Sequence, residues 1–173
     1  GLSHADLVWG YDSARAQARE SLRKAGELVA PLLDRLSADQ IAAMEHRIAE
    51  ENRKFYRDNL RGSERDRRAR RAPLAINRLE DWVGKLTQAQ VQRVREYAER
   101  APLTDELRDR DRKRLQKDVV AIVRAHEARA QLPERLAHWE KLREPASAAA
   151  REAWRAQYFA MLLDVDRMLT PEQ

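Results

Sequence analysis

The chain has 173 residues, which is enough for one domain or one elongated helical array with a core. Charged residues make up 36% and there are only five Gly, so the composition favours long amphipathic helices around a thin core. The net charge of +5 permits binding to nucleic acid, anionic lipid or acidic protein surfaces, whereas the lack of Cys excludes disulfides, thiol nucleophiles and Cys-ligated zinc.

The first two helical patterns have clear end signals. The first covers about residues 5–36, with apolar residues at steps of three or four, and Pro31 predicts a kink or a break near its end. The second begins at Ser37, which forms a capping box with Gln40 three residues later. Gly62 supplies the stop signal after this second helix.

A third pattern begins with Ser63 as N-cap and acidic residues in the first turn, and it runs to about Leu86. Pro73 lies inside it, where we expect a kink. Since only Gly62 and Ser63 separate the second and third patterns, we predict that they form a long helical hairpin. The rest of the chain would be organised around this hairpin.

Four more helices are expected after the hairpin. Thr87 and Gln90 repeat the capping box, while Pro133 and Pro145 suit the first position of a helix. The expected ranges are 87–101, 104–126, 133–142 and 145–169. No window alternates as a strand does. We therefore predict a single all-α domain, residues 1–173, built as an elongated array or bundle of about seven helices.

Two Arg-rich runs, 61–71 and 108–117, each carry a net charge of +4. Such runs suit a phosphate-binding surface, because guanidinium groups pair with phosphate oxygens. The alternative is a solvated helix face whose charges pair along the helix. The candidate pairs are Glu64–Arg68, Asp66–Arg70 and Asp109–Lys113. The sequence shows no aromatic stacking platform, recognition helix or zinc finger, so nucleic acid is the less favoured partner.

The patterns required for catalysis or metal binding are missing. The four His have no metal-binding spacing, and His126 is interpreted as a hydrogen-bonded core residue of the fifth helix. Ser and Thr are few and mostly serve as caps, and there is no Gly-rich phosphate loop. We predict a protein that is not an enzyme, with no catalytic residues, metal, cofactor or small-molecule substrate.

The aromatic residues have two readings. On the apolar face of a helix they are usually core residues, but half-exposed beside Arg they make an amphiphilic surface suited to unfolded or helical partners. The residues that we predict to contact a protein partner are Phe55, Tyr56, Arg67, Arg68, Arg70, Arg71 and Trp82. All seven lie in or beside the predicted hairpin.

Residues 36–40, 86–90 and 169–173 resemble the Leu-Thr-x-x-Gln motif of the Spy/CpxP periplasmic stress chaperones. A hydrophobic staple with a capping box gives the same pattern from helix physics alone.

Four longer segments carry a second resemblance, which covers the chain from Leu36 onward. They are residues 36–55, 62–68, 77–90 and 107–117. They resemble an uncharacterised family of proteobacterial helical lipoproteins. The resemblance implies a protein on the periplasmic side of the outer membrane, held by a lipidated Cys that this chain lacks. It supplies no catalytic residues.

Gly1-Leu2-Ser3-His4 does not look like a natural start, so we expect a piece of a longer precursor without its signal and lipobox. The apolar runs are too short to span a bilayer, so membrane contact would come only through the lipid anchor. The leading hypothesis is a non-enzymatic, periplasm-facing module that binds other proteins, as an ATP-independent chaperone does. The alternatives are a binder of nucleic acid or another anionic surface through the Arg-rich runs, and a structural spacer of the envelope.

Overall fold

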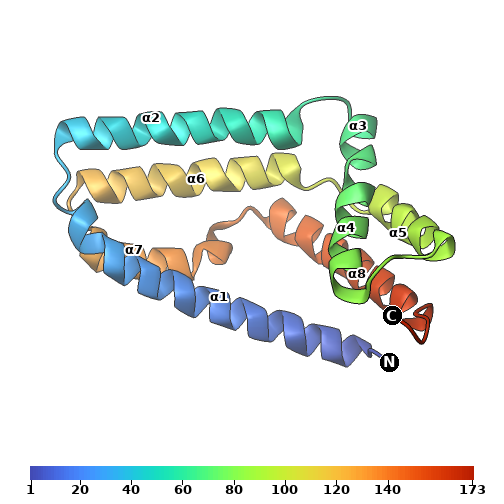
Figure 1. Ribbon diagram of the computed structural model, residues 1–173. Helices are drawn as coiled ribbons and strands as arrows, with labels where there is room; N and C mark the ends of the chain where they lie inside the picture. Colours follow the sequence, from blue (N-terminus) through green and yellow to red (C-terminus); the bar gives the residue numbers. More distant parts are fainter.

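The computed structural model describes residues 1–173 as helices joined by short turns (Figure 1), which confirms the predicted all-α array. The α-helices are α1 (His4–Leu33), α2 (Ala38–Phe55), α3 (Glu64–Ala69), α4 (Arg71–Val83), α5 (Gln88–Arg100), α6 (Asp105–Arg124), α7 (Ala128–Ala137) and α8 (Pro145–Arg167). A π-helical segment, η1 (Tyr56–Leu60), extends α2, and a 3₁₀ segment, η2 (Trp139–Leu142), precedes α8. None of these helices is both long enough and apolar enough to cross a membrane.

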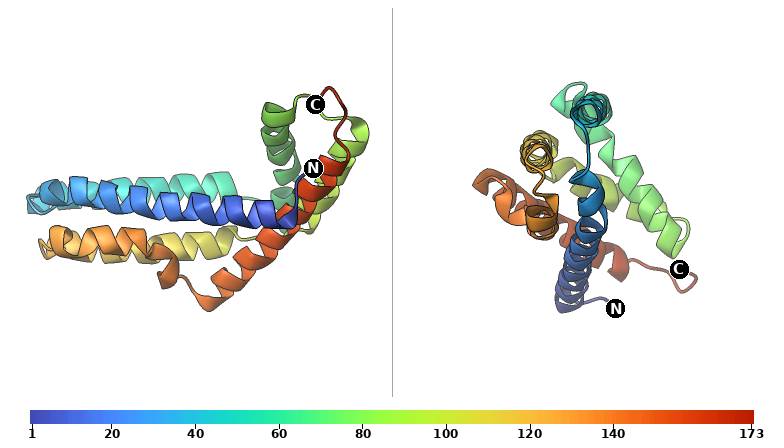
Figure 2. Two further views of the ribbon diagram at one scale, coloured as in Figure 1. Left: turned by 90° about the horizontal axis from the view of Figure 1, so that it is seen from below. Right: turned by 90° about the vertical axis from the view of Figure 1, so that its left-hand side faces the viewer.

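The long helices pair with partners that are distant in the sequence. α1 lies along α7 and α2 lies along α6, while α4, α5 and α8 pack together at the other end of the molecule (Figures 1 and 2). The predicted hairpin between the second and third patterns is therefore not formed. The chain turns away at Gly62, whose φ is +95°, and the apolar face of α4 packs on α5 and α8 instead.

The third expected helix is two helices. α3 ends at Ala69 and α4 begins at Arg71, so the chain breaks ahead of Pro73 instead of kinking at it. Pro73 is the third residue of α4. An N–H at that position has no partner within the helix, so proline is tolerated there.

The α6–α7 region differs from the prediction at Pro133 and at His126. α7 begins at Ala128, with Pro133 inside it, because the carboxylate of Asp34 accepts hydrogen bonds from the first two N–H groups, of Ala128 (2.6 Å) and Arg129 (3.1 Å). His126 lies beyond the end of α6, exposed and with φ of 55°. It is thus a helix-terminating residue in the left-handed conformation and not the predicted core histidine.

Pro31 does not break α1, because the helix continues past it to Leu33. Pro145 is the first residue of α8, as predicted.

The core is thin, since only 19 of the 173 residues are buried. One cluster, Ala30, Ile122, Ala128 and Leu132, lies where α1, α6 and α7 meet. A second, Val94, Met161 and Val165, joins α5 to α8. α1 and α7 approach each other closely at Gly26, where an added Cβ would lie 2.9 Å from the Cα of Pro133.

The predicted capping boxes start α2 and α5. Ser37 pairs with Gln40 and Thr87 pairs with Gln90 through reciprocal side-chain and backbone hydrogen bonds. Gln90 is fully buried, and its Nε2 also donates to the backbone oxygen of Met168 and to Oε1 of Gln173, both at 2.8 Å. Two of the Leu-Thr-x-x-Gln segments, 86–90 and 169–173, therefore interlock, which gives them a structural role.

Candidate protein-binding surface

A groove of about 530 Å³ runs between α2 and α6. Its apolar lining is formed by Ile48 and Ala49 of α2 and by Val120 and Ala121 of α6. The other lining residues are polar or charged and are Glu45, Asn52, Lys113, Gln116, Lys117 and Arg124. An apolar floor between two helices with a polar rim is the arrangement that accepts an amphipathic helix.

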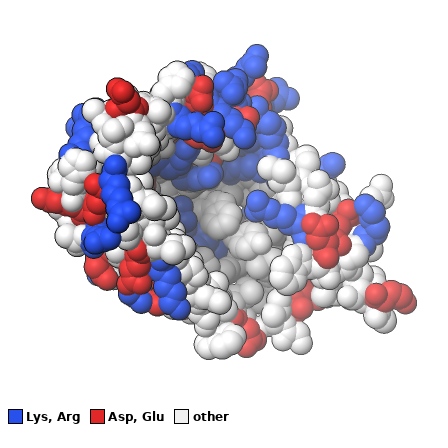
Figure 3. Space-filling model, turned by 60° about the vertical axis from the view of Figure 1, so that its left-hand side comes forward, with Lys and Arg blue, Asp and Glu red and all other residues white.

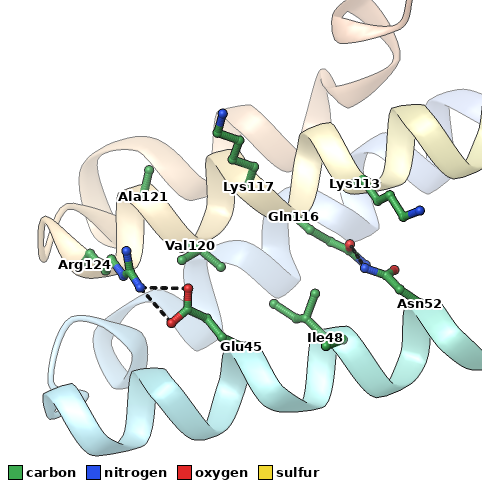
Figure 4. Close-up of a pocket in the computed structure, with 10 residues that line it drawn as sticks. Glu45, Ile48, Asn52, Lys113, Gln116, Lys117, Val120, Ala121 and Arg124 are labelled. Atoms are coloured by element: carbon green, nitrogen blue, oxygen red, sulfur yellow. Dashed lines mark hydrogen bonds and ion pairs between the residues drawn. The ribbon is translucent and has the colours of Figure 1, made fainter.

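Two polar pairs bridge the helices at the ends of this groove (Figure 4). At one end, Arg124 Nη2 donates to both carboxylate oxygens of Glu45 at 2.8 Å. At the other, Asn52 Nδ2 donates to Oε1 of Gln116 at 2.9 Å. Ile48 lies between these pairs on the α2 side (Figure 4). The bridges fix the spacing of the two helices, so the groove is largely preformed.

α2 is poorly covered by the rest of the protein. Ile41 is the one buried residue among its 18 residues. Met44, Ile48 and Phe55, which the sequence places on its buried face, are only partly covered. The apolar face of α2 is therefore open along the groove, and a partner that filled the groove would complete its burial.

The predicted partner-binding arginines mostly hold the fold together. Arg68 Nη1 donates to the backbone oxygens of Glu99 and Ala101, both at 2.8 Å. Arg71 donates to Ala101 O and Pro102 O, both at 2.6 Å. These carbonyls lie at the end of α5, where helix geometry leaves them without backbone partners.

The environment of Arg71 fits this internal role. Burial lowers the pKa of its guanidinium; nearby Asp105 opposes this effect, while Arg68 and Arg67 add to it. Arg67 itself has 13% of its side chain exposed and pairs with Glu106 at 3.2 Å.

Arg70 is exposed, but its Nη2 donates to the backbone oxygen of Arg61 at 2.7 Å. Of the three predicted charge pairs, Glu64–Arg68 (2.9 Å) and Asp109–Lys113 (2.7 Å) form. The carboxylate of Asp66 is instead taken by Ser63 in the capping box of α3, so the predicted pair with Arg70 is not made.

Phe55 joins the second Arg-rich run, 108–117, to the end of α2. The guanidinium carbons of Arg112 and Arg108 lie 4.1 and 5.3 Å from the centre of its ring. Cation–π contacts of this kind stabilise a partly exposed aromatic side chain beside basic groups. Phe55 and Arg67 therefore both contact the N-terminal half of α6.

The other two predicted aromatic residues are free of such contacts. Tyr56 is 58% exposed at the start of η1, and Trp82 is 88% exposed near the end of α4. Leu74, two turns before Trp82, is 60% exposed, so α4 presents a second apolar strip. Trp82 lies at the opposite end of α4 from Arg71, so the seven predicted residues form two surfaces and not one.

Basic side chains gather along one edge of a hollowed face whose floor is mostly uncharged (Figure 3). No group of three or more His, Asp or Glu side chains lies within reach of a common metal ion.

The groove residues Ile48, Ala49, Val120 and Ala121 were not among the sequence candidates. The helical periodicity shows that Ile48 faces a neighbour, but not that the neighbour is α6 or that it leaves a gap. The alanines that widen the gap look like ordinary core residues in the sequence.

No curated protein and no solved structure matches the chain. The profile of a family of unknown function, DUF6279, matches residues 12–147, which is most of the chain. The protein therefore belongs to this family of unknown function.

Proposed function

We propose that the protein is a non-enzymatic module that binds other proteins through the groove between α2 and α6. The observation that carries this proposal is the open apolar face of α2, which buries only Ile41 and borders a groove of about 530 Å³. Contiguous apolar surface with a polar rim is characteristic of protein interaction sites.

The groove favours an amphipathic helical segment with acidic residues. Its length along two helices suits a third helix that inserts apolar side chains at three- and four-residue spacing. Three of its lining residues are basic, Lys113, Lys117 and Arg124. Arg124 pairs with Glu45 and Lys113 pairs with Asp109, which leaves an excess of one positive charge, on Lys117. An acidic partner would be attracted and oriented by this excess.

Exposed tryptophans support chaperone-like binding of incompletely folded proteins over a single specific partner. Trp82 and Trp9 are 88% and 74% exposed, so apolar contacts are offered outside the groove as well. Flexible contact with several apolar segments requires such dispersed surface. The resemblance of residues 36–55, 62–68, 77–90 and 107–117 to helical lipoproteins supports a site of action on the periplasmic side of the outer membrane.

A charge placed in the groove tests the proposal. Ala49→Glu points an acidic side chain into the groove, whereas Ala43→Glu places the same change on an exposed position of α2 outside it. We expect Ala49→Glu to weaken the suppression of client aggregation and the capture of envelope proteins, and Ala43→Glu to leave both unchanged. Trp82→Ser shows whether the strip on α4 contributes separately.

The proposal fails if the unaltered protein neither suppresses aggregation of an unfolded client at equal molar ratio nor retains any envelope protein in a pull-down. It also fails if the two glutamate variants behave alike. Retention of DNA at low salt that is lost as salt rises would favour the Arg-rich runs as a nucleic-acid surface instead. Fractionation of cells that produce the full-length protein tests the outer-membrane location.

A further inference from the structure

The two halves of α1 are held in different ways. Gly26 and Ala30, the only buried residues of this helix, both lie in its C-terminal half and contact α7. α7 has 10 residues, about 15 Å of helix, so it reaches along only about a third of α1. None of residues 4–25 is buried, and the N-terminal half passes beside α8 instead (Figures 1 and 2).

Phe159 of α8 is the side chain that the N-terminal half of α1 covers. It is 5% exposed, yet it belongs to neither of the two core clusters. The rings of His4 and Tyr11, both on α1, meet it edge to face with their centres 5.9 Å away. The guanidinium carbon of Arg155 lies 5.1 Å from the centre of the Tyr11 ring and 5.9 Å from that of Phe159. Phe159 is therefore shielded from water by a segment that lies outside the core.

Polar contacts join the same half of α1 to η2 and to the end of α8. Arg15 pairs with Glu140, and Arg19 lies 3.7 Å from the same carboxylate. Leu2 N donates to Asp166 Oδ2 at 2.8 Å in an exposed position. Ion pairs and hydrogen bonds that water can reach contribute little to stability. The aromatic contacts of Phe159 are thus the main attachment.

We propose that residues 4–19 of α1 form a strap, which opens from α8 as one unit while the two core clusters stay packed. Opening breaks the aromatic and polar contacts and exposes Phe159 to water. It costs less free energy than unfolding of the whole chain, which must also expose both clusters. Gly10 lowers the cost further, because glycine favours the unfolded backbone and nothing lies within 4 Å of its Cβ position.

The protein thereby has a closed form and an open form, which differ in the apolar surface of α8. The strap shares no residue with the α2–α6 groove. Its opening is therefore tested independently of partner binding.

Hydrogen exchange of the native protein, followed amide by amide by NMR, tests the strap. We expect residues 8–19 to exchange at least about tenfold faster than residues 24–33 after correction for intrinsic rates. Protection should be similar over residues 8–19, because one opening event exposes them all. Equal protection in the two segments would overturn the proposal. Protection that rises step by step from residue 8 to residue 19 would also overturn it, since that is the pattern of a fraying helix end.

Two variants break the aromatic contact from opposite sides. Tyr11→Ala removes the ring from α1, and Phe159→Leu removes it from α8. Each should speed exchange over residues 8–19 about tenfold, which corresponds to about 1.4 kcal/mol, and leave residues 24–33 unchanged. Trp9→Ala is the matched control, because Trp9 is on the same helix and 74% exposed, and it should exchange as the wild type does. The proposal is wrong if Trp9→Ala has the same effect as Tyr11→Ala, or if both contact variants speed exchange equally in the two segments.

Discussion

Replacement of Gln90 by Ala should destabilise the protein far more than the loss of an ordinary helix cap. Gln90 Oε1 accepts from Thr87 N at 2.8 Å and from Gln173 Nε2 at 3.1 Å. Its Nε2 donates to Met168 O and Gln173 Oε1, both at 2.8 Å, and the residue is fully buried. At about 1 kcal/mol for each hydrogen bond, with partners left unsatisfied in a buried site, we expect a loss of about 2–4 kcal/mol.

Gln40→Ala is the matched control, because Gln40 has the same role in the capping box of α2 but is exposed and bonds only to Ser37. It should cost about 0.5–1 kcal/mol. Urea unfolding followed by circular dichroism measures both values. A double-mutant cycle of Gln90→Ala with Gln173→Ala should give a coupling above about 0.5 kcal/mol. If Gln90→Ala costs no more than Gln40→Ala, the interlock of the two motifs does not contribute to stability.

Three further outcomes are expected. Gly26→Ala should lower the free energy of unfolding by about 1–3 kcal/mol, because the new Cβ would meet the backbone of Pro133. Gly10→Ala should raise that free energy by about 0.5–1 kcal/mol, because nothing lies within 4 Å of the new Cβ. Thermal unfolding of both variants tests the two predictions. Arg71→Gln should lower the unfolding free energy by about 1.5–3 kcal/mol by freeing the carbonyls at the end of α5, and faster hydrogen exchange in α5 should accompany it; an unchanged urea midpoint would contradict this role. Burial alone would raise the pKa of Glu140, but its bond to Arg15 and the nearby arginines hold that pKa below the ordinary value of 4.5. The charged Glu140 side chain therefore stabilises the fold above pH 4.5, and this stabilisation is lost as the pH falls through the pKa of the folded state. The stability difference between wild type and Glu140→Gln should therefore shrink on acidification, and a difference that stays constant with pH would refute this assignment.

Helix existence and helix starts were predictable because their causes are local. Ser37, Ser63 and Thr87 each cap a helix with the residue three positions later. Thr104 does not, since its side chain makes no capping bond. Helix boundaries that depend on other segments were not predicted. The N-terminus of α7 is an example, because it is fixed by the carboxylate of Asp34, nearly 100 residues earlier in the chain.

The pairing of helices was not predictable from periodicity. An apolar stripe shows which face of a helix is buried but not which helix covers it, so α2 was assigned to the helix that follows it and pairs instead with α6. The contacts of the candidate site residues were not predictable either. Phe55 lies beside Arg108 and Arg112 because α2 packs on α6, and the carbonyl partners of Arg68 and Arg71 arise only from the packing of α3 and α4 on α5.

The pairing of α1 with α7 has a consequence for synthesis of the chain. α1 has 30 residues, about 45 Å of helix, and buries only Gly26 and Ala30, both beside α7. About 100 residues separate the end of α1 from the end of α7. At ribosomal rates, α1 therefore waits about 5–20 s for its partner. During that interval α1 exposes Leu28, Leu32 and the apolar face that later packs on α7, so it needs protection by other proteins until α7 has been made.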